Sequence, residues 1–335
     1  MIVAVGNEDG FRPAWWLPGP HLQAIGARLL RPRGGVRCER ERLELPDGDF
    51  LDLDWVVEVG GRSPEPAAPL VLVLHGLEGS ASSDYVLSTH RALAGRGLAS
   101  LALNFRSCSG EPNRLPRFYH SGDTADAAAV LDLLRERFPR RRIGAVGFSL
   151  GGNVLLKLLG ECGGGGRGRL APDAAAAISV PFDLAAGITT LERGLGPIYQ
   201  RYFLRKLRRK VRLKASILRP CVDVDALLAA RSLRRFDDLG TARLHGFRDA
   251  DDYYQRSSSA PWLPAIRVPT LLIHAGDDPF LPSAAIPRAE VRANPHLDAI
   301  FPERGGHVGF VSGPPWAPVF WAEQTAADFL ASRLL

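Results

Sequence analysis

The feature that most restricts the fold of this chain is a repeated order of short apolar run, turn and amphipathic segment. The first run, Leu70–Leu74, is Leu-Val-Leu-Val-Leu and has no polar position, which predicts a strand covered on both faces of a parallel sheet. Further strands are expected at 98–103, 143–147, 174–180, 270–274 and 297–301, and helices at 122–137, 151–159 and 317–334. This alternation predicts an α/β fold with a mostly parallel, doubly wound sheet.

The order of the segments also predicts one large domain with an insertion. Residues 36–45 and 50–57 alternate charged and apolar positions around a Pro-Asp-Gly-Asp turn, which favours a β-hairpin. Residues 1–35 are expected to wrap the domain surface, and the glycine-rich residues 163–168 to form a flexible surface loop. From 181 to 263 the apolar strands stop and arginine-rich helical sequence replaces them. We therefore expect a core of residues 36–180 and 264–335, with a helical cap insertion at 181–263.

The composition excludes several other classes. Hydrophobic residues make up 46% of the 335 positions and charged residues 23%, values typical of globular domains. No apolar run approaches the ~18 residues that span a bilayer, and residues 1–10 lack a signal-peptide pattern, so a cytoplasmic location is expected. Four cysteines stand far apart without metal-binding spacing. We expect them to be free thiols and expect no metal or other cofactor; they are Cys38, Cys108, Cys162 and Cys221.

Residues 147–151 carry the strongest chemical signal. They read Gly-Phe-Ser-Leu-Gly, a G-x-S-x-G pattern that follows a predicted strand and precedes a predicted helix. In that context the pattern indicates a nucleophilic serine on a sharp turn, where side chains in place of Gly147 and Gly151 would clash. The helix N-terminus also favours developing negative charge. Ser149 is therefore the predicted nucleophile.

A nucleophilic serine of this kind needs an acid and then a base further along the chain. Asp277 and Asp278 follow the strand predicted at 270–274, and a carboxylate at the end of such a strand points into the ligand crevice. We favour Asp278, four residues before Pro282, and assign Asp277 to the turn, although the adjacent pair leaves either open. His307 lies after the last predicted strand between glycines, which makes it the preferred base among the eight histidines: His21, His75, His90, His120, His245, His274, His296 and His307.

The same chemistry requires donors for a developing oxyanion. The backbone N–H of Leu150 is the first expected donor, and the second is assigned to Leu77, in the loop after the strand Leu70–Leu74. His75 in that loop is expected to be a structural support. His120 and Asp123 suggest a second site, but we interpret Ser121 and Asp123 as caps of the following helix.

With these residues in place, the chain resembles the YheT-like branch of the α/β-hydrolase superfamily, related to the ABHD1/ABHD3 lipid hydrolases. The likeness spans nearly the whole chain and is carried by residues 13–23, 75–80, 104–110, 119–124, 147–151, 277–280 and 305–310. The resemblance implies Ser149, Asp278 and His307 as a triad with esterase or lipase-like activity. Ser107 departs from the glycine usual in the family, which leaves the triad untouched.

The segment from Arg201 to Lys214 is strongly basic. Phe203, Leu207 and Val211 recur every four residues, so one helical face is apolar and the rest cationic. We expect a cap helix docked by its apolar face with solvated arginines outside. Weak peripheral attraction to anionic membranes is the alternative. Nucleic acid is not expected as a partner, because no recognition module accompanies the net charge of +6.

These observations together predict a serine hydrolase that cleaves short- to medium-chain acyl or lipid-like carboxylic esters without a cofactor. Two alternatives stay open. One is a thioesterase or acyltransferase that uses the same triad. The other is a non-catalytic ligand receptor on the same fold.

Overall fold

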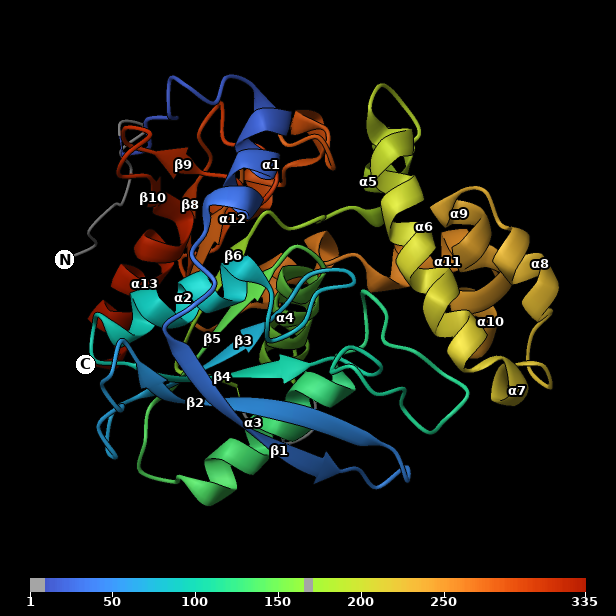
Figure 1. Cartoon of the computed structure of the whole chain (residues 1–335), viewed down its shortest axis with the longest axis horizontal. Helices are drawn as coiled ribbons and strands as arrows, with labels where there is room; N and C mark the ends of the chain where they lie inside the picture. Colours follow the sequence, from blue (N-terminus) through green and yellow to red (C-terminus); the bar gives the residue numbers. More distant parts are fainter. Residues whose placement is uncertain (1–9, 166–170) are drawn as a thin grey trace.

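The computed structural model describes residues 10–165 and 171–335. The first nine residues of the predicted wrapping segment, and residues 166–168 of the predicted glycine-rich loop, lie outside the described residues. The described residues form an eight-stranded sheet in the order β1-β2-β4-β3-β5-β6-β7-β8 (Figure 1). Its strands are β1 (Val36–Glu44), β2 (Phe50–Val59), β3 (Leu70–Leu74), β4 (Ala99–Asn104), β5 (Ile143–Phe148), β6 (Ala174–Ile178), β7 (Thr270–Ile273) and β8 (Leu297–Ile300).

The hairpin of β1 and β2 is antiparallel and joins β4 at one edge of the sheet, whereas every pair from β4 to β8 is parallel. The predicted α/β fold with a mostly parallel sheet is thus confirmed. A separate two-stranded ladder pairs β9 (Val311–Ser312) with β10 (Val319–Phe320). The last helix, α13 (Trp321–Leu334), therefore begins after β10 rather than at residue 317, as the sequence had suggested.

The side chains of β3 alternate between the two faces of the sheet, and each face is covered by helices. Leu70, Leu72 and Leu74 pack into one apolar cluster with α3 (Ala125–Arg137) and α4 (Leu150–Gly163), whereas Val71 and Val73 pack into a second with α2 (Asp84–Ala94) and α13. Successive strand side chains point to opposite faces, so an all-apolar strand needs helices on both. Helix α12 (Arg288–Ala293) contributes Val291 to the first cluster.

Helix α2 was not expected from the sequence. Its buried face includes three polar side chains in succession, Ser88, Thr89 and His90, which interrupt the apolar periodicity. Thr89 Oγ1 donates to the carbonyl of Tyr85 and His90 Nδ1 lies 2.8 Å from Ser100 Oγ, whereas His90 Nε2 is buried without a partner among the described residues. These hydrogen bonds offset part of the cost of burying polar groups in the helix.

The start of α3 corrects another expectation. The helix begins at Ala125, and neither Ser121 nor Asp123 caps it. Asp123 Oδ2 instead accepts a 2.7 Å hydrogen bond from Arg117, and the N–H of Ser121 donates to Tyr253. Arg117 is six residues before Asp123, whereas Tyr253 is 132 residues after Ser121, so the local sequence pattern could not reveal the second partner.

Between β6 and β7 the chain is helical and packs around an apolar cluster of its own, to the right of the sheet in Figure 1. The boundaries of the predicted cap and core stay a prediction. The elements are α5 (Leu184–Leu191), α6 (Gly196–Leu213), α7 (Ala215–Leu218), α8 (Val224–Ala229), α9 (Leu233–Phe236), the π-helical turn η1 (Asp237–Thr241), α10 (Ala242–Leu244), α11 (Ala250–Ser257) and the 3₁₀ turn η2 (Ala260–Ala265). A further 3₁₀ turn, η3 (Ser283–Ala285), follows β7.

Helix α6 is docked by more than its apolar residues. Lys206, Lys210 and Lys214 recur every four residues and turn inward, where each ammonium donates to oxygen atoms of the core. Lys214 is buried and donates to Asn113 Oδ1 and to two backbone carbonyls. Sequence reasoning had expected solvated arginines and had not anticipated that the lysines turn inward. Arginines remain exposed, namely Arg201, Arg205, Arg209 and Arg212.

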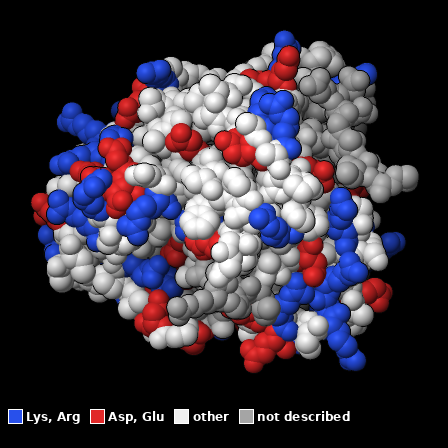
Figure 2. Space-filling view, turned by 180° about the vertical axis from the view of Figure 1, so that it is seen from behind, with Lys and Arg blue, Asp and Glu red and all other residues white. Residues whose placement is uncertain are grey.

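Helix α1 (Pro20–Leu30) lies beside the start of α6, because His21 Nδ1 lies 2.9 Å from the hydroxyl of Tyr199. Figure 2 shows the molecule from behind the view of Figure 1, and on this face basic and acidic side chains are interspersed. No helix in the described ranges combines the length and apolar character needed to cross a membrane.

Candidate active site

Ser149 stands on the sharp turn between β5 and α4. Its φ is 51°, an unusual value for a residue with a side chain, and its N–H donates to the carbonyl of Ile178 at 2.9 Å. A Cβ at Gly151 would lie 2.5 Å from the carbonyl oxygens of Leu74 and His75, and one at Gly147 would lie 2.5 Å from the oxygen of Gly151. Both positions therefore require glycine, and the turn that they allow lifts the hydroxyl above the strand ends.

His307 and Asp278 complete a chain of hydrogen bonds with this hydroxyl. Ser149 Oγ lies 2.9 Å from His307 Nε2, and His307 Nδ1 lies 2.8 Å from Asp278 Oδ2. Burial opposes ionisation of the Asp278 carboxyl, but His307, His274 and the N–H of Phe280 together outweigh it, and the pKa of Asp278 is held below its usual value. An ionised carboxylate on Nδ1 leaves Nε2 free to accept a proton.

The loop that carries His307 is fixed at several points. Asp277 Oδ1 accepts a 2.8 Å hydrogen bond from the N–H of Gly306, and Ser179 Oγ accepts one of 2.9 Å from the N–H of Val308. The ring of Phe280 stacks on the imidazole with 4.1 Å between centroids. Sequence reasoning had assigned Asp277 only to the turn and missed Ser179 and Phe280. The position of Phe280, two residues after Asp278, was the one available signal.

The loop after β3 packs against the nucleophile. A Cβ at Gly76 would lie 3.2 Å from the Cβ of Ser149. The N–H groups of Gly76 and Glu78 donate to the hydroxyls of Tyr85 and Tyr119, whereas that of Leu77 has no acceptor within the described residues. Leu150 begins α4, where N–H groups lack intrahelical partners. Both N–H groups thus remain available beside Ser149.

His75 is buried in the same loop. Its Nδ1 lies 2.8 Å from the carbonyl of Gly76, and its Nε2 accepts from the N–H of Phe105. Burial lowers the pKa of His75 to about 3, so the ring is neutral at physiological pH. These contacts support the structural role expected from the sequence.

A buried polar cluster contacts the loop after β3 through Glu78. The carboxylate of Glu78 accepts from Tyr119 at 3.0 Å and from Lys210 at 2.7 Å, and Lys210 also contacts Cys108 Sγ. Glu78 has a φ of 56°, so its backbone occupies the left-handed region. Lys210 comes from α6, so this cluster ties the helices between β6 and β7 to the loop at Ser149. Sequence reasoning missed it, because its members lie up to 132 residues apart.

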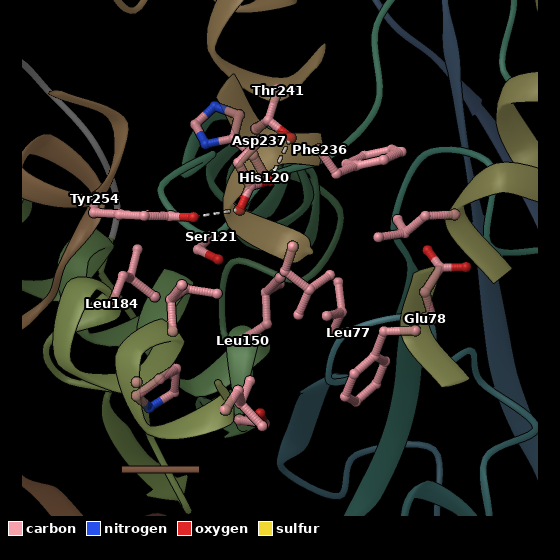
Figure 3. Close-up of a pocket in the computed structure, with 18 of the residues that line it drawn as sticks. Leu77, Glu78, His120, Ser121, Leu150, Leu184, Phe236, Asp237, Thr241 and Tyr254 are labelled. Atoms are coloured by element: carbon pink, nitrogen blue, oxygen red, sulfur yellow. Dashed lines mark hydrogen bonds between the residues drawn. The ribbon is translucent and has the colours of Figure 1, made fainter. Parts of the chain in front are cut away.

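An apolar cavity of about 130 Å³ is lined by Ser149, His307 and residues of the helices between β6 and β7. Figure 3 shows this cavity in close-up. Its side walls include Leu77, Leu150, Leu184 and Phe236. One end carries a polar group, Asp237, whose carboxylate accepts from Thr241 and Tyr254 (Figure 3). Burial raises the pKa of Asp237 to about 6. The cavity can therefore hold an acyl chain next to the nucleophile.

One cluster has the composition of a metal site. Ligand atoms of His120, Asp123 and His245 lie within 4.8 Å of one another. However, Asp123 already pairs with Arg117, and the pKa of His120 is lowered to about 3 by burial and by nearby cations, foremost Arg117. Cations beside the cluster oppose a divalent ion, so the residues fit a structural polar cluster better than a metal centre.

Comparison with known proteins is in line with this geometry. A model described as the alpha/beta hydrolase family matches residues 70–319. The chain is an α/β hydrolase. Its match to YheT of Escherichia coli (strain K12), which carries the provisional name of an esterase, is 42% identical and covers 94% of this chain and 91% of YheT. This α/β hydrolase therefore belongs to the YheT-like branch.

Two further proteins extend the comparison. Phospholipase ABHD3 of Mus musculus is 32% identical and covers 87% of this chain and 72% of ABHD3. Among solved structures, the Pyrococcus furiosus esterase Pf2001 superimposes with a TM-score of 0.57 at 16% identity and covers 90% of this α/β hydrolase and 94% of that chain. At this identity the second likeness concerns the fold alone.

Proposed function

We propose that this α/β hydrolase is a serine esterase that cleaves short- to medium-chain acyl or lipid-like carboxylic esters through an acyl-enzyme on Ser149. The observation that carries the proposal is the continuous path of hydrogen bonds from Ser149 through His307 to Asp278 beside an apolar cavity. An activated hydroxyl at the entrance of an apolar cavity suits an ester with an apolar acyl part.

In the first half of the proposed reaction, Ser149 Oγ attacks the ester carbonyl carbon while His307 Nε2 accepts the hydroxyl proton. The C–O bond to the alcohol then breaks, and His307 returns the proton to the leaving oxygen. In the second half, water takes the place of the alcohol and releases the acid. Asp278 holds the ring orientation and stabilises the transient imidazolium.

The proposed oxyanion donors are the N–H groups of Leu150 and Leu77. Both are available next to Ser149, and the hydroxyls of Tyr85 and Tyr119 fix the residues on either side of Leu77. A preorganised donor of this kind contributes about 3 kcal/mol to transition-state stabilisation. The proposed reaction uses no cofactor.

The acyl preference is supported by the cavity and by the relatives. The cavity walls near Ser149 are mainly leucine and phenylalanine, and the volume of about 130 Å³ favours short to medium chains. The names of the relatives are those of a phospholipase and of a provisional esterase. A series of p-nitrophenyl esters of increasing acyl length would locate the preferred chain.

A fluorophosphonate probe tests the nucleophile directly, because it labels only an activated serine. We expect labelling of the native protein at Ser149, confirmed by peptide mass spectrometry, and none in S149A or in heat-denatured protein. A matched S216A variant, at an exposed serine of α7, should label like the wild type. Labelling of S149A at the wild-type rate would refute the assignment.

The same assay separates the two alternatives. A non-catalytic receptor would leave Ser149 unlabelled although the triad is present. A thioesterase would prefer acyl thioesters to the matching oxygen esters, and an acyltransferase would pass the acyl group to an added alcohol faster than to water.

A further inference from the structure

A second cavity reaches Ser149 from the side of helix α1. It has a volume of about 540 Å³ and shares Leu77, Ser149, Phe280 and His307 with the apolar cavity. Its outer part, which we call the vestibule, is bordered by α1 and α6 and includes Arg28, Arg33, Tyr199, Tyr202 and Lys206. The nucleophile thus stands where two cavities of different character meet.

The vestibule has an excess of positive charge. One of its cations is already paired: Arg31 contacts Asp84 at 3.1 Å and Glu323 at 2.7 Å. In contrast, Arg28, Arg33 and Lys206 form no ion pair with any acidic residue that the structure describes. Their charges are therefore available to a ligand.

Two of these free cations are placed together by one aromatic ring. The Arg28 guanidinium lies 5.1 Å from the ring centroid of Tyr202, and the Lys206 ammonium lies 5.0 Å from the same centroid. Lys206 also donates to the carbonyl oxygen of Glu78, in the loop beside Ser149. Burial raises the pKa of Tyr202, but Lys206 and Arg28 outweigh it and the pKa is lowered, which indicates a locally positive potential.

A carboxylic ester has two limbs, and the two cavities differ in what they can accept. Lys210 lines the apolar cavity but is already paired with Glu78, so an ionised group there would lose its hydration without gaining a free partner. The vestibule instead offers a guanidinium and an ammonium, the groups that proteins use to bind phosphate. The acyl part remains on Ser149 after the first step, whereas the alcohol must leave, and the wider cavity gives it a path.

We propose that the vestibule is an anion subsite for the alcohol part of the substrate, formed by Arg28, Arg33 and Lys206. The substrate class is then a carboxylic ester whose alcohol carries a phosphate or another anionic group. This inference rests on the proposed esterase function and adds to it the chemistry of the leaving group.

The test compares two esters that share one hexanoyl group. One has a neutral alcohol, glycerol, and the other an anionic alcohol, glycerol phosphate. For the wild type we expect kcat/KM to be at least about tenfold higher with the anionic ester than with the neutral one, mainly because KM is lower. One or two charge-assisted hydrogen bonds to the anionic group would produce a difference of this size. Raising the salt concentration should reduce this ratio, since the vestibule is solvent-accessible.

Variants show whether the named residues are responsible. R28Q and K206M should each lower the ratio of anionic to neutral kcat/KM about tenfold, while the exposed α6 control R201Q leaves the ratio unchanged. A merely structural loss would lower both activities equally and leave the ratio as it was. Equal kcat/KM for the two esters in the wild type, or an unchanged ratio in R28Q and K206M, would overturn the subsite.

The outcomes separate this subsite from the esterase itself. If the neutral ester is cleaved as fast as the anionic one and the fluorophosphonate labels Ser149, only the subsite fails. If neither ester is cleaved and Ser149 is not labelled, the esterase proposal fails. Repeating the comparison with long-chain forms of both esters in vesicles distinguishes a lipid headgroup from a water-soluble phosphate ester, because a lipid substrate would keep its preference in the bilayer.

Discussion

The carboxylate of Asp277 accepts a hydrogen bond of 2.8 Å from the N–H of Gly306, the residue directly before His307. Its neighbour Asp278 accepts from the imidazole of His307 itself, at the same distance. Two adjacent carboxylates thus act on one loop at two places, one on the backbone and one on the ring. Their roles can be separated because Asp278 meets the proton-carrying group and Asp277 does not.

We therefore expect D278N to lower kcat by about 10³- to 10⁴-fold, because an amide can no longer stabilise the imidazolium or enforce the tautomer. D277N keeps an oxygen that can accept from Gly306, so its kcat should fall by less than about tenfold. Steady-state kinetics on a p-nitrophenyl ester measures both. The reverse order of the two losses would assign the acid to Asp277.

The candidate site was accessible to sequence reasoning where residue type and chain order carry the information. The strand before Ser149, the glycines around it and the late position of His307 were enough to name both residues. The choice between Asp277 and Asp278 depends on which carboxylate faces the ring, a matter of side-chain direction that adjacent positions cannot reveal. Ser179 was out of reach, because its bond to Val308 joins segments 129 residues apart.

Gly151 offers a test of the turn that holds Ser149. In G151A the new Cβ would lie 2.5 Å from two carbonyl oxygens at the end of β3, so backbone must move. We expect a loss of about 3 kcal/mol in the free energy of unfolding and at least a tenfold fall in kcat. The control G95A, with φ of −62° and no neighbour closer than 3.4 Å, should change stability by less than about 1 kcal/mol. Urea denaturation followed by circular dichroism compares them, and equal stabilities would contradict this account.

The parallel sheet was predictable because central strands such as β3 and β6 are apolar throughout, and such runs have few alternatives. The contacts of α6 were not. Its periodicity identifies an apolar face, but the acceptors of Lys214 are Asn113 and the carbonyls of Leu115 and Arg117, about 100 residues away. Whether a cation is solvated or buried is decided by such distant partners, which a helical pattern does not contain.

Asp237 makes stability depend on pH. Burial raises the pKa of its carboxyl to about 6 in the folded chain, whereas an unfolded aspartate titrates near 4. The folded state therefore holds the extra proton between these values, and the free energy of unfolding falls as pH rises through that window, by at most about 3 kcal/mol. In D237N this loss is absent.

We therefore expect the free energy of unfolding of D237N, minus that of the wild type, to be larger at pH 7.5 than at pH 4.5. Urea denaturation at both pH values measures this difference. The neighbouring D238N, at a half-exposed carboxylate paired with Arg235, should not show this change with pH. If the stability difference between D237N and the wild type is the same at both pH values, Asp237 is not the titrating group.

The exposed arginines of α6 predict weak binding to anionic membranes. Arg201, Arg205, Arg209 and Arg212 are solvent-exposed and form no ion pair with a described acidic residue, and a basic residue near an anionic surface contributes about 1 kcal/mol. In vesicle flotation we expect association with phosphatidylserine-containing vesicles at low salt, little with neutral vesicles, and loss in the variant with all four changed to glutamine. Lys210 and Lys214 should not compensate, because their ammonium groups already donate to oxygen atoms of the core. A control variant has four exposed arginines outside α6 changed to glutamine and should bind as the wild type does. The four are Arg37, Arg62, Arg140 and Arg142. Equal flotation with neutral and anionic vesicles would show that the charge of α6 does not direct the protein to membranes.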